Sequence, residues 1–201
     1  MRFFRAPLIA KLLFPSGIWK GKEADSIYLT FDDGPDPEVT PWVLDLLKEF
    51  QIKATFFIVG RNVENYPELL ERILSEGHRI GNHTMDHECG TKTRLITYID
   101  SINKADRFME TDLFRPPYGK ITQSQFRKLT EEKKKIVFWS WLSYDFDKSL
   151  SSKKIIQKTK LIKGGDILVF HDSKKAFPNL KNSLIEIIEQ LKGRGFEFKT
   201  L

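Results

Sequence analysis

Residues 27–35 read IYLTFDDGP, an apolar and β-branched run that ends in two acids and a turn signal. The first five residues favour a β-strand, and the last three are typical of the turn that ends one. Adjacent carboxylates repel each other unless a cation or a division of roles compensates. Turn chemistry explains Asp33 but leaves Asp32 without a role, so this strand is expected to end at a functional site.

Strand-like and helix-like segments alternate through the rest of the chain. Residues 41–50 show helical spacing, with Thr40 as the expected N-cap, and residues 54–59 are an apolar run typical of a strand covered on both faces. Further helices are predicted over residues 67–75, 93–110, 123–133, 151–162 and 180–192, and further strands over 79–81, 113–114, 136–142, 167–170 and 196–200. Seven β/α repeats predict an α/β fold with a parallel sheet, either open or closed into a barrel.

Polar residues follow five of these predicted strands: Asp32-Asp33, His83 to His87, Arg115, Asp145 and His171. The functional site of a parallel α/β fold lies at the carboxyl ends of its strands. The spacing of His83 and His87 lets both imidazoles approach one point. Together with Asp33 they would leave one coordination position open, as catalytic zinc sites with three protein ligands do. The sequence therefore predicts a metal-dependent hydrolase.

These motifs resemble the carbohydrate esterase family 4 polysaccharide deacetylases, also called the NodB homology domain. TFDDGP at residues 30–35, HTMDH at 83–87 and RPPY at 115–118 match the family's first three motifs in order. The family fold is a distorted parallel (β/α) barrel with about seven strands, so the resemblance implies that fold here. We expect a single domain over residues 26–201, preceded by an N-terminal extension over residues 1–25.

The resemblance implies a role for each matching polar residue. Asp33, His83 and His87 would bind one divalent metal ion, zinc in the first place, with cobalt or another transition metal as alternatives. Asp32 would be the general base that takes a proton from water. Arg115 would pair with Asp32 and orient it, because a nearby guanidinium favours the ionised carboxylate.

The last two motifs match the family less closely. LVFH at residues 168–171 resembles the fifth motif, and His171 would be the general acid that protonates the departing amine. An imidazolium needs a carboxylate partner to remain charged. The family supplies it from an Asp-x-x-Asp-Trp motif, which reads LSYDF at residues 142–146 here. Asp145 is the expected partner of His171, and Asp147 is the alternative.

The resemblance places four residues beside the substrate: Pro117, Tyr118, Phe146 and Leu168. The backbone N–H of Tyr118 would donate to the developing oxyanion. Phe146 stands where the family has Trp, which preserves an apolar wall but removes the indole N–H, so substrate choice is affected more than chemistry. Trp139 and Trp141 are expected in the core, and His78 is expected to be structural.

The implied activity is hydrolysis of the N-acetyl, or in some relatives O-acetyl, group of an amino-sugar glycan such as peptidoglycan or a chitin-like oligosaccharide, with release of acetate. Two alternatives stay open. A related amidohydrolase would act on a small non-sugar amide or imide, as the degenerate fourth motif and the lack of an export signal suggest. A non-catalytic glycan-binding module would keep the fold and lose turnover.

Composition excludes several other classes of protein. With 40% apolar and 30% charged residues, the chain is globular. A net charge of +6 attracts anionic partners, but no nucleic-acid-binding motif accompanies it, so no nucleic acid partner is expected. No run of about 20 apolar residues suggests a transmembrane segment. Without a clear signal peptide, a cytoplasmic location is expected, with cell-envelope association as the alternative. The sequence leaves the oligomeric state unknown.

Overall fold

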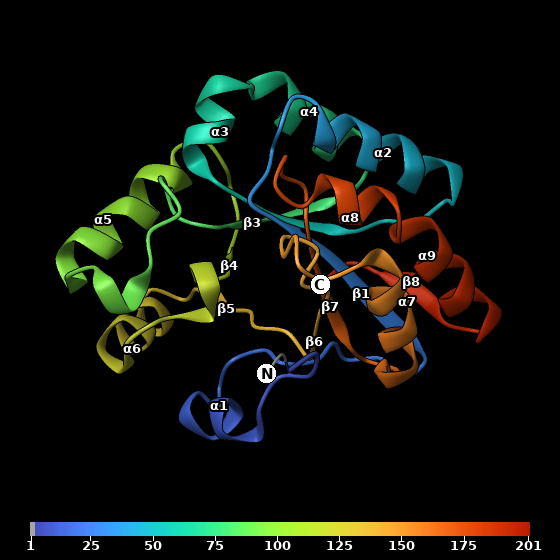
Figure 1. The fold of residues 1–201 in the computed structure, drawn as a ribbon. Coiled ribbons are helices and arrows are strands. Elements are labelled where there is room, and N and C mark those ends of the chain that lie inside the picture. The colour runs from blue at the N-terminus through green and yellow to red at the C-terminus, as the bar shows by residue number, and fades with distance from the viewer. Residues whose placement is uncertain (1–2) are drawn as a thin grey trace.

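The structure is a computed structural model and describes residues 3–201. Its strands form one parallel sheet that curls into a partial barrel, with helices around the outside (Figure 1). Along the sheet the order is β5 (Lys135–Ile136), β4 (Leu113–Phe114), β3 (Arg79–Asn82), β2 (Thr55–Ile58), β1 (Ser26–Asp32), β7 (Ile167–His171) and β6 (Trp141–Leu142). β8 (Glu197–Lys199) pairs with the start of β1. The predicted distorted parallel barrel of about seven strands is confirmed.

The helices lie mostly in the connections between strands. They are α1 (Leu8–Leu13), α2 (Val39–Glu49), α3 (Gly60–Asn65), α4 (Pro67–Ser75), α5 (Leu95–Asp106), α6 (Gln123–Glu131), α7 (Ser152–Gln157), α8 (Phe177–Lys181) and α9 (Leu184–Gly193), with short 3-10 turns η1 (Gly90–Lys92), η2 (Pro117–Gly119) and η3 (Lys158–Leu161). α1, α3 and α8 were not predicted, because five or six residues carry too little periodicity. No helix within residues 3–201 is long and apolar enough to cross a membrane.

Alternation along the strands separates the core under the helices from the inside of the barrel. On β1, Leu29 and Phe31 belong to the main core cluster, whereas Tyr28 belongs to an inner cluster. Asp32 lies on the same side of β1 as Tyr28. The register partner of Asp32 on β7 is His171. The polar residues that end these strands therefore lie at the mouth of the barrel.

The single strand predicted over residues 136–142 is wrong. β5 ends at residue 136 and pairs with β4, whereas β6 begins at residue 141 and pairs with β7. The N-terminal segment lies against the chain between them: Ile18 bridges Val137, and Arg5 bridges Trp141. β5 and β6, the two edge strands of the sheet, therefore do not pair with each other. The N-terminal segment covers both of them, so neither edge is left exposed.

Candidate functional site

Asp33, His83 and His87 meet at the mouth of the barrel. Asp33 directly follows β1, and the two histidines follow β3, on the far side of β2. Asp33 Oδ1 lies 3.1 Å from His87 Nε2 and 3.6 Å from His83 Nε2. One ligand atom from each residue lies within 4.8 Å of the other two. A carboxylate oxygen and two imidazole nitrogens at this spacing fit one divalent cation with an open position.

The orientation of His83 favours metal binding. Its Nδ1 lies 2.8 Å from the carbonyl oxygen of Arg115, so a protonated Nδ1 donates to that carbonyl and leaves the Nε2 lone pair directed toward Asp33. Burial lowers the pKa of His83 to about 4, which keeps the ring neutral at physiological pH. A neutral imidazole fixed in one tautomer is the form that ligates a metal.

The loops that carry these ligands have unusual backbone conformations. Asp33, Thr84 and His87 have φ angles of 79°, 67° and 58°, a region that few non-glycine residues adopt. Side-chain amides hold the loops: Asn62 Nδ2 donates to the Asp33 carbonyl at 2.8 Å, and Asn82 Oδ1 accepts from the Thr84 N–H at 2.7 Å. Such strain persists only where the surroundings impose it, and it concentrates at functional sites.

Asp32 is held by Arg115 inside the barrel. Arg115 is fully buried, and its Nη1 donates to Asp32 Oδ1 at 2.6 Å and to Thr30 Oγ1 at 2.7 Å. Its Nη2 donates to the Phe138 carbonyl at 3.1 Å, and its guanidinium carbon lies 3.9 Å from the centre of the Phe57 ring. These contacts fix the guanidinium, and through it the carboxylate that lines the pocket.

His171 pairs with Asp145. Nδ1 of His171 lies 2.7 Å from Asp145 Oδ1, and the His171 backbone N–H donates to Asp145 Oδ2 at 2.9 Å. Burial alone would lower the pKa of His171, but the charge and hydrogen bond of Asp145 raise it to about 9. The alternative partner, Asp147, instead accepts from the backbone N–H and hydroxyl of Ser149.

Aromatic side chains form walls of the pocket into which these groups open. The ring of Tyr118 lies 4.7 Å from that of His87, and the ring of Phe146 lies 4.9 Å from that of His171. Trp141 is fully buried as expected. Trp139 packs against the inner core cluster, but it is only half-buried and also lines the pocket. Trp139 lies in the interval between β5 and β6, where strand alternation does not decide which way a side chain points.

Two of the residues expected beside the substrate do not line this pocket. Leu168 is fully buried in the main core, whereas Val169, the next residue of β7, faces the pocket. Successive strand residues point to opposite faces, which accounts for the exchange. Pro117 is buried at the start of η2, and Tyr118 follows it with a φ of 61°. Pro117 therefore shapes the turn that presents Tyr118.

Asp172 is a buried acid that the sequence does not single out. Its Oδ1 accepts from the Gly34 N–H at 3.1 Å, and its Oδ2 accepts from the Thr40 hydroxyl at 2.6 Å. Thr40 was predicted to be the N-cap of α2, but Glu38 holds that position. The Thr40 hydroxyl instead accepts from the Asp36 N–H at 2.8 Å. Burial raises the pKa of Asp172 well above its usual range. This network secures the turn after Asp33.

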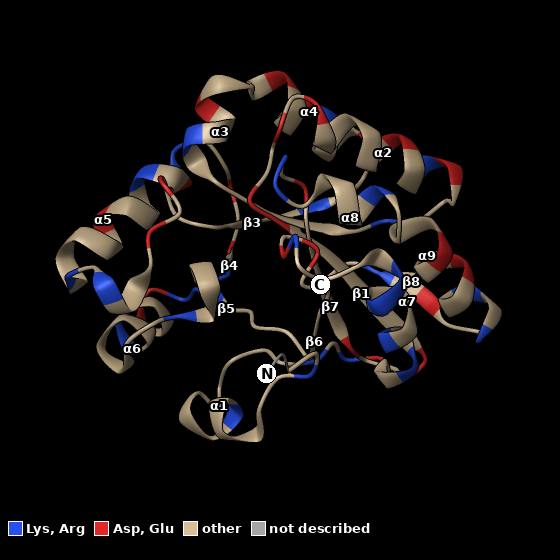
Figure 2. Cartoon of the chain, in the orientation of Figure 1, with Lys and Arg blue, Asp and Glu red and all other residues tan. Residues whose placement is uncertain are grey.

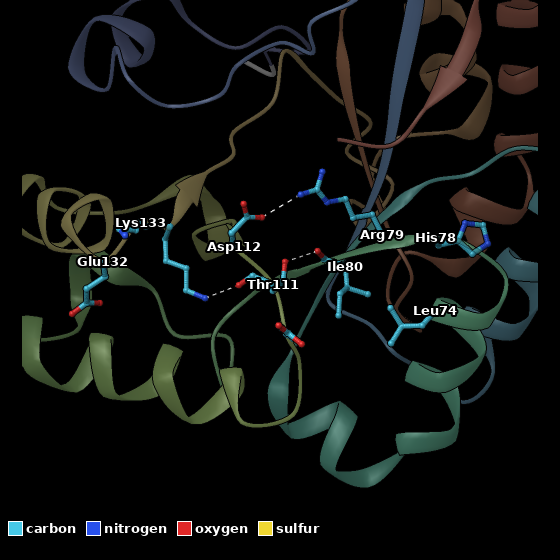
Figure 3. A pocket seen from close by; sticks show the side chains of 10 residues that line it. Leu74, His78, Arg79, Ile80, Thr111, Asp112, Glu132 and Lys133 are labelled. Carbon is cyan, nitrogen blue, oxygen red and sulfur yellow. Dashed lines mark hydrogen bonds and ion pairs between the residues drawn. The ribbon is translucent and has the colours of Figure 1, made fainter.

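A second hollow lies away from this pocket, beside β3 (Figure 3). Several of its charged groups are engaged: Arg79 pairs with Asp112 at 3.2 Å, and Lys134 Nζ donates to the Thr111 carbonyl at 2.8 Å. His78 lies at its edge, where Nδ1 accepts from a backbone N–H at 3.1 Å, consistent with a structural role. Within residues 3–201, the only cluster suited to a metal is the one at the barrel mouth.

Comparison with known proteins identifies relatives of the chain. The family model for polysaccharide deacetylase matches residues 20–135, more than half of the chain. A peptidoglycan-N-acetylglucosamine deacetylase of Bacillus cereus is 36% identical over 204 residues, which cover 96% of both chains. A chitooligosaccharide deacetylase of Bradyrhizobium is 31% identical over 194 residues, which cover 88% of this chain and 89% of the relative.

Solved structures show the same fold. The crystal structure of a peptidoglycan N-acetylglucosamine deacetylase matches with a TM-score of 0.88 at 35% identity, over 92% of this chain and 91% of that one. A Bacillus anthracis protein described as a pseudoenzyme of carbohydrate esterase family 4 has a TM-score of 0.83 at 22% identity, over 93% of this chain and 68% of that one. The fold alone therefore does not establish catalysis. By the family match and the sequence identity together, the chain belongs to the polysaccharide deacetylase family.

Proposed function

We propose that the protein removes N-acetyl groups from an amino-sugar glycan by hydrolysis, releasing acetate and a free amine. The observation that carries this proposal is the arrangement of one base and one acid around a three-residue metal cluster. Asp32 and His171 are register partners on neighbouring strands and line the same pocket. Asp33, next to Asp32 in the chain, belongs to the metal cluster. A proton acceptor, a proton donor and a cation site thus meet at one point.

The first step is attack of water on the acetyl carbonyl. A divalent cation held by Asp33, His83 and His87, zinc by preference, would acidify water and polarise that carbonyl. Asp32, paired with Arg115, accepts the proton that the attacking water loses. The backbone N–H of Tyr118 donates to the carbonyl oxygen as negative charge develops on it.

The second step is departure of the sugar amine. With a pKa of about 9, His171 is protonated at neutral pH. Its Nδ1 faces Asp145, so Nε2 is the nitrogen that delivers a proton to the amine as the carbon–nitrogen bond breaks. The proton taken by Asp32 and the one given by His171 balance the reaction, which yields acetate and the amine.

The pocket walls support a glycan in preference to a small imide. Tyr118, Trp139 and Phe146 line the pocket with aromatic surface, which suits the apolar faces of sugar rings. The relatives named above act on peptidoglycan and on chitooligosaccharide. A glycan of the cell envelope is therefore the proposed substrate, which would place the protein at the envelope.

Acetate release tests the proposal. The protein is stripped of metal, resupplied with zinc or cobalt, and given N-acetylglucosamine oligomers and peptidoglycan fragments. We expect turnover by the natural chain and a loss of about 10²–10⁴-fold in Asp32→Asn and in His171→Ala. Asp86→Asn is the matched control, because Asp86 lies between the two histidines in sequence but pairs with Arg61 at 2.9 Å, away from the pocket. Equal activity in all four proteins would refute the assignment.

A further inference from the structure

The N-terminal segment exposes large apolar side chains that no other part of the described chain covers. The exposed fractions are 54% for Phe3, 78% for Leu8, 68% for Ile9, 79% for Leu12 and 56% for Leu13. α1 buries none of its residues. Single exposed apolar residues are ordinary, but four on one six-residue helix, together with Phe3 five residues before it, indicate an interaction surface.

This segment is anchored on both sides of α1. Before the helix, the Ala6 N–H donates to the Ser140 carbonyl at 3.1 Å, next to the Arg5–Trp141 bridge. After it, the Leu13 carbonyl accepts from Gln123 Nε2 at 2.7 Å. A six-residue helix is not stable by itself in water, so these anchors hold α1 against the barrel with its apolar residues directed to solvent.

Two basic stretches of the chain meet at Arg5, although Arg5 and Lys20 themselves pair with Asp166, at 2.6 Å and 3.7 Å. Residues 3–22 contain one arginine and three lysines and no acidic residue, and residues 148–163 contain six lysines and no acidic residue. Within the described chain, none of those six lysines forms an ion pair with an acid. Arg5 Nη1 donates to the Leu161 carbonyl at 2.7 Å, which joins the two segments. Figure 2 shows blue residues on α7, at the right of the view, and on the N-terminal segment, with α1 at the lower left.

We propose that these two segments form a docking surface for an anionic phospholipid membrane. The apolar side chains of α1 would enter the boundary between headgroups and acyl chains, and the lysines would attract the anionic headgroups. A nucleic acid would use the lysines but leave α1 exposed to water. A second copy of the chain would cover α1. It would also bring the lysine-rich segments of the two copies together, and these would repel each other.

Docking on this surface would leave the catalytic pocket open. The N-terminal segment runs antiparallel to β6, from Phe4 beside Leu142 to Ala6 beside Ser140. It therefore passes away from the carboxyl edge of the sheet before α1 begins. None of the α1 residues and none of the six lysines lines the pocket, so the membrane inference is independent of the proposed chemistry.

Vesicle flotation of the full chain tests the proposal. We expect binding to phosphatidylcholine vesicles that contain phosphatidylglycerol, and about tenfold weaker binding to phosphatidylcholine alone or at high salt. Leu8→Ser combined with Leu12→Ser should lower the partition coefficient at least about tenfold. Lys153→Gln combined with Lys160→Gln should lower it by a similar factor on the anionic vesicles only.

Two matched controls make the result decisive. Ile96→Ser removes an 80% exposed apolar side chain from α5, and Lys92→Gln removes an exposed lysine from η1; both should bind as the natural chain does. Circular dichroism and acetate release on soluble oligomers should be unchanged in every variant.

The proposal is overturned if the natural chain does not float with anionic vesicles, or if Ile96→Ser weakens binding as much as the α1 variant. It is also overturned if light scattering finds a dimer that the α1 variant separates, without vesicle binding. Binding of duplex DNA that depends on Lys153 and Lys160 but not on Leu8 and Leu12, again without vesicle binding, would overturn it in favour of a nucleic acid.

Discussion

Arg115 Nη1 lies 2.6 Å from Asp32 Oδ1 inside the barrel, where both side chains are shielded from solvent. The same guanidinium nitrogen reaches Thr30, and the other reaches the backbone of residue 138, near Trp139 in the pocket wall. One buried cation thus connects β1 with the interval between β5 and β6. The orientation of Asp32, the proposed base, therefore depends on Arg115, which does not line the pocket.

Breaking this pair should destabilise the fold as well as the reaction. Arg115→Met leaves Asp32 buried without its counter-charge, so the free energy of unfolding should fall by about 3–5 kcal/mol. Adding Asp32→Asn to that variant should restore part of the loss, because the uncompensated charge is then gone. Urea denaturation of the two single variants and the double variant measures both effects. Strictly additive losses would show that the two residues are not coupled.

The rate of deacetylation should fall as the pH rises through about 9. His171 has a pKa raised to about 9, and only its protonated form can supply the amine with a proton. The pairing with Asp145 raises this pKa above the ordinary imidazole value, so it also stabilises the fold. This stabilisation is complete at pH values below the ordinary imidazole pKa and is lost as the pH rises through 9. In Asp145→Asn the basic limb of the kcat profile should move toward lower pH. An unmoved limb would remove His171 from the role of acid.

Metal binding should stabilise the natural chain against heat. A ligand that binds only the folded state, at about 100 times its Kd, adds about 2.7 kcal/mol to the free energy of unfolding. Zinc added to the stripped protein should therefore raise the melting temperature. His83→Gln and His87→Gln should lose most of that rise, and Asp86→Asn should keep it. Calorimetric titration with zinc gives the affinities; similar values in all four proteins would place the metal elsewhere.

His78 should make stability depend on pH in the acid range. Burial lowers its pKa to about 4, so between the ordinary imidazole value and 4 the unfolded chain binds a proton that the folded chain does not. Stability should therefore fall by about 3 kcal/mol as the pH drops through that interval. In His78→Asn, the amide oxygen can accept the Ala54 N–H without titrating. The difference between the two unfolding curves should vanish above the ordinary imidazole pKa, and a constant difference would contradict this account.

Gly119 should control the position of Trp139. Its φ is 65°, and a Cβ there would lie 2.5 Å from the Trp139 ring. Gly119→Ala should move the ring, raise KM about tenfold and leave kcat within about threefold, because substrate contact is lost while the reacting groups stay in place. Gly195→Ala is the matched control, since Gly195 has a φ of 81° and open space around it. The control should share the backbone cost of roughly 1–2 kcal/mol without the change in KM.

Local patterns predicted most of the fold. The buried strand that became β1 and the helix over residues 67–75 were recognised from short-range signals alone. The error over residues 136–142 has a long-range cause. That run is largely apolar and is typical of one strand, but its start pairs with Ile18 and its end with Arg5. No window around residue 139 contains those partners, so periodicity could not reveal the break.

The site could be predicted where its residues lie close together in the sequence. Asp32, Asp33, His83 and His87 lie within two short motifs, and the structure brings them together. The choice between Asp145 and Asp147 was open because a shift of two residues keeps the same side of a strand. Tyr144 has a φ of 57°, so the backbone turns before Asp145 and alternation does not apply there. Asp172 and Trp139 were missed because the contacts that give each its place in the site are made with residues far away in the sequence.

The closure of the barrel by residues 5–18 constrains the order of events during synthesis. Arg5 binds Asp166, 161 positions later, and it bridges Trp141 as well. Residues 5–18 thus leave the ribosome well before the strands that they contact. During that interval the leucines of α1 are accessible to a chaperone or a membrane. This early segment is among the last parts of the described chain to form its native contacts.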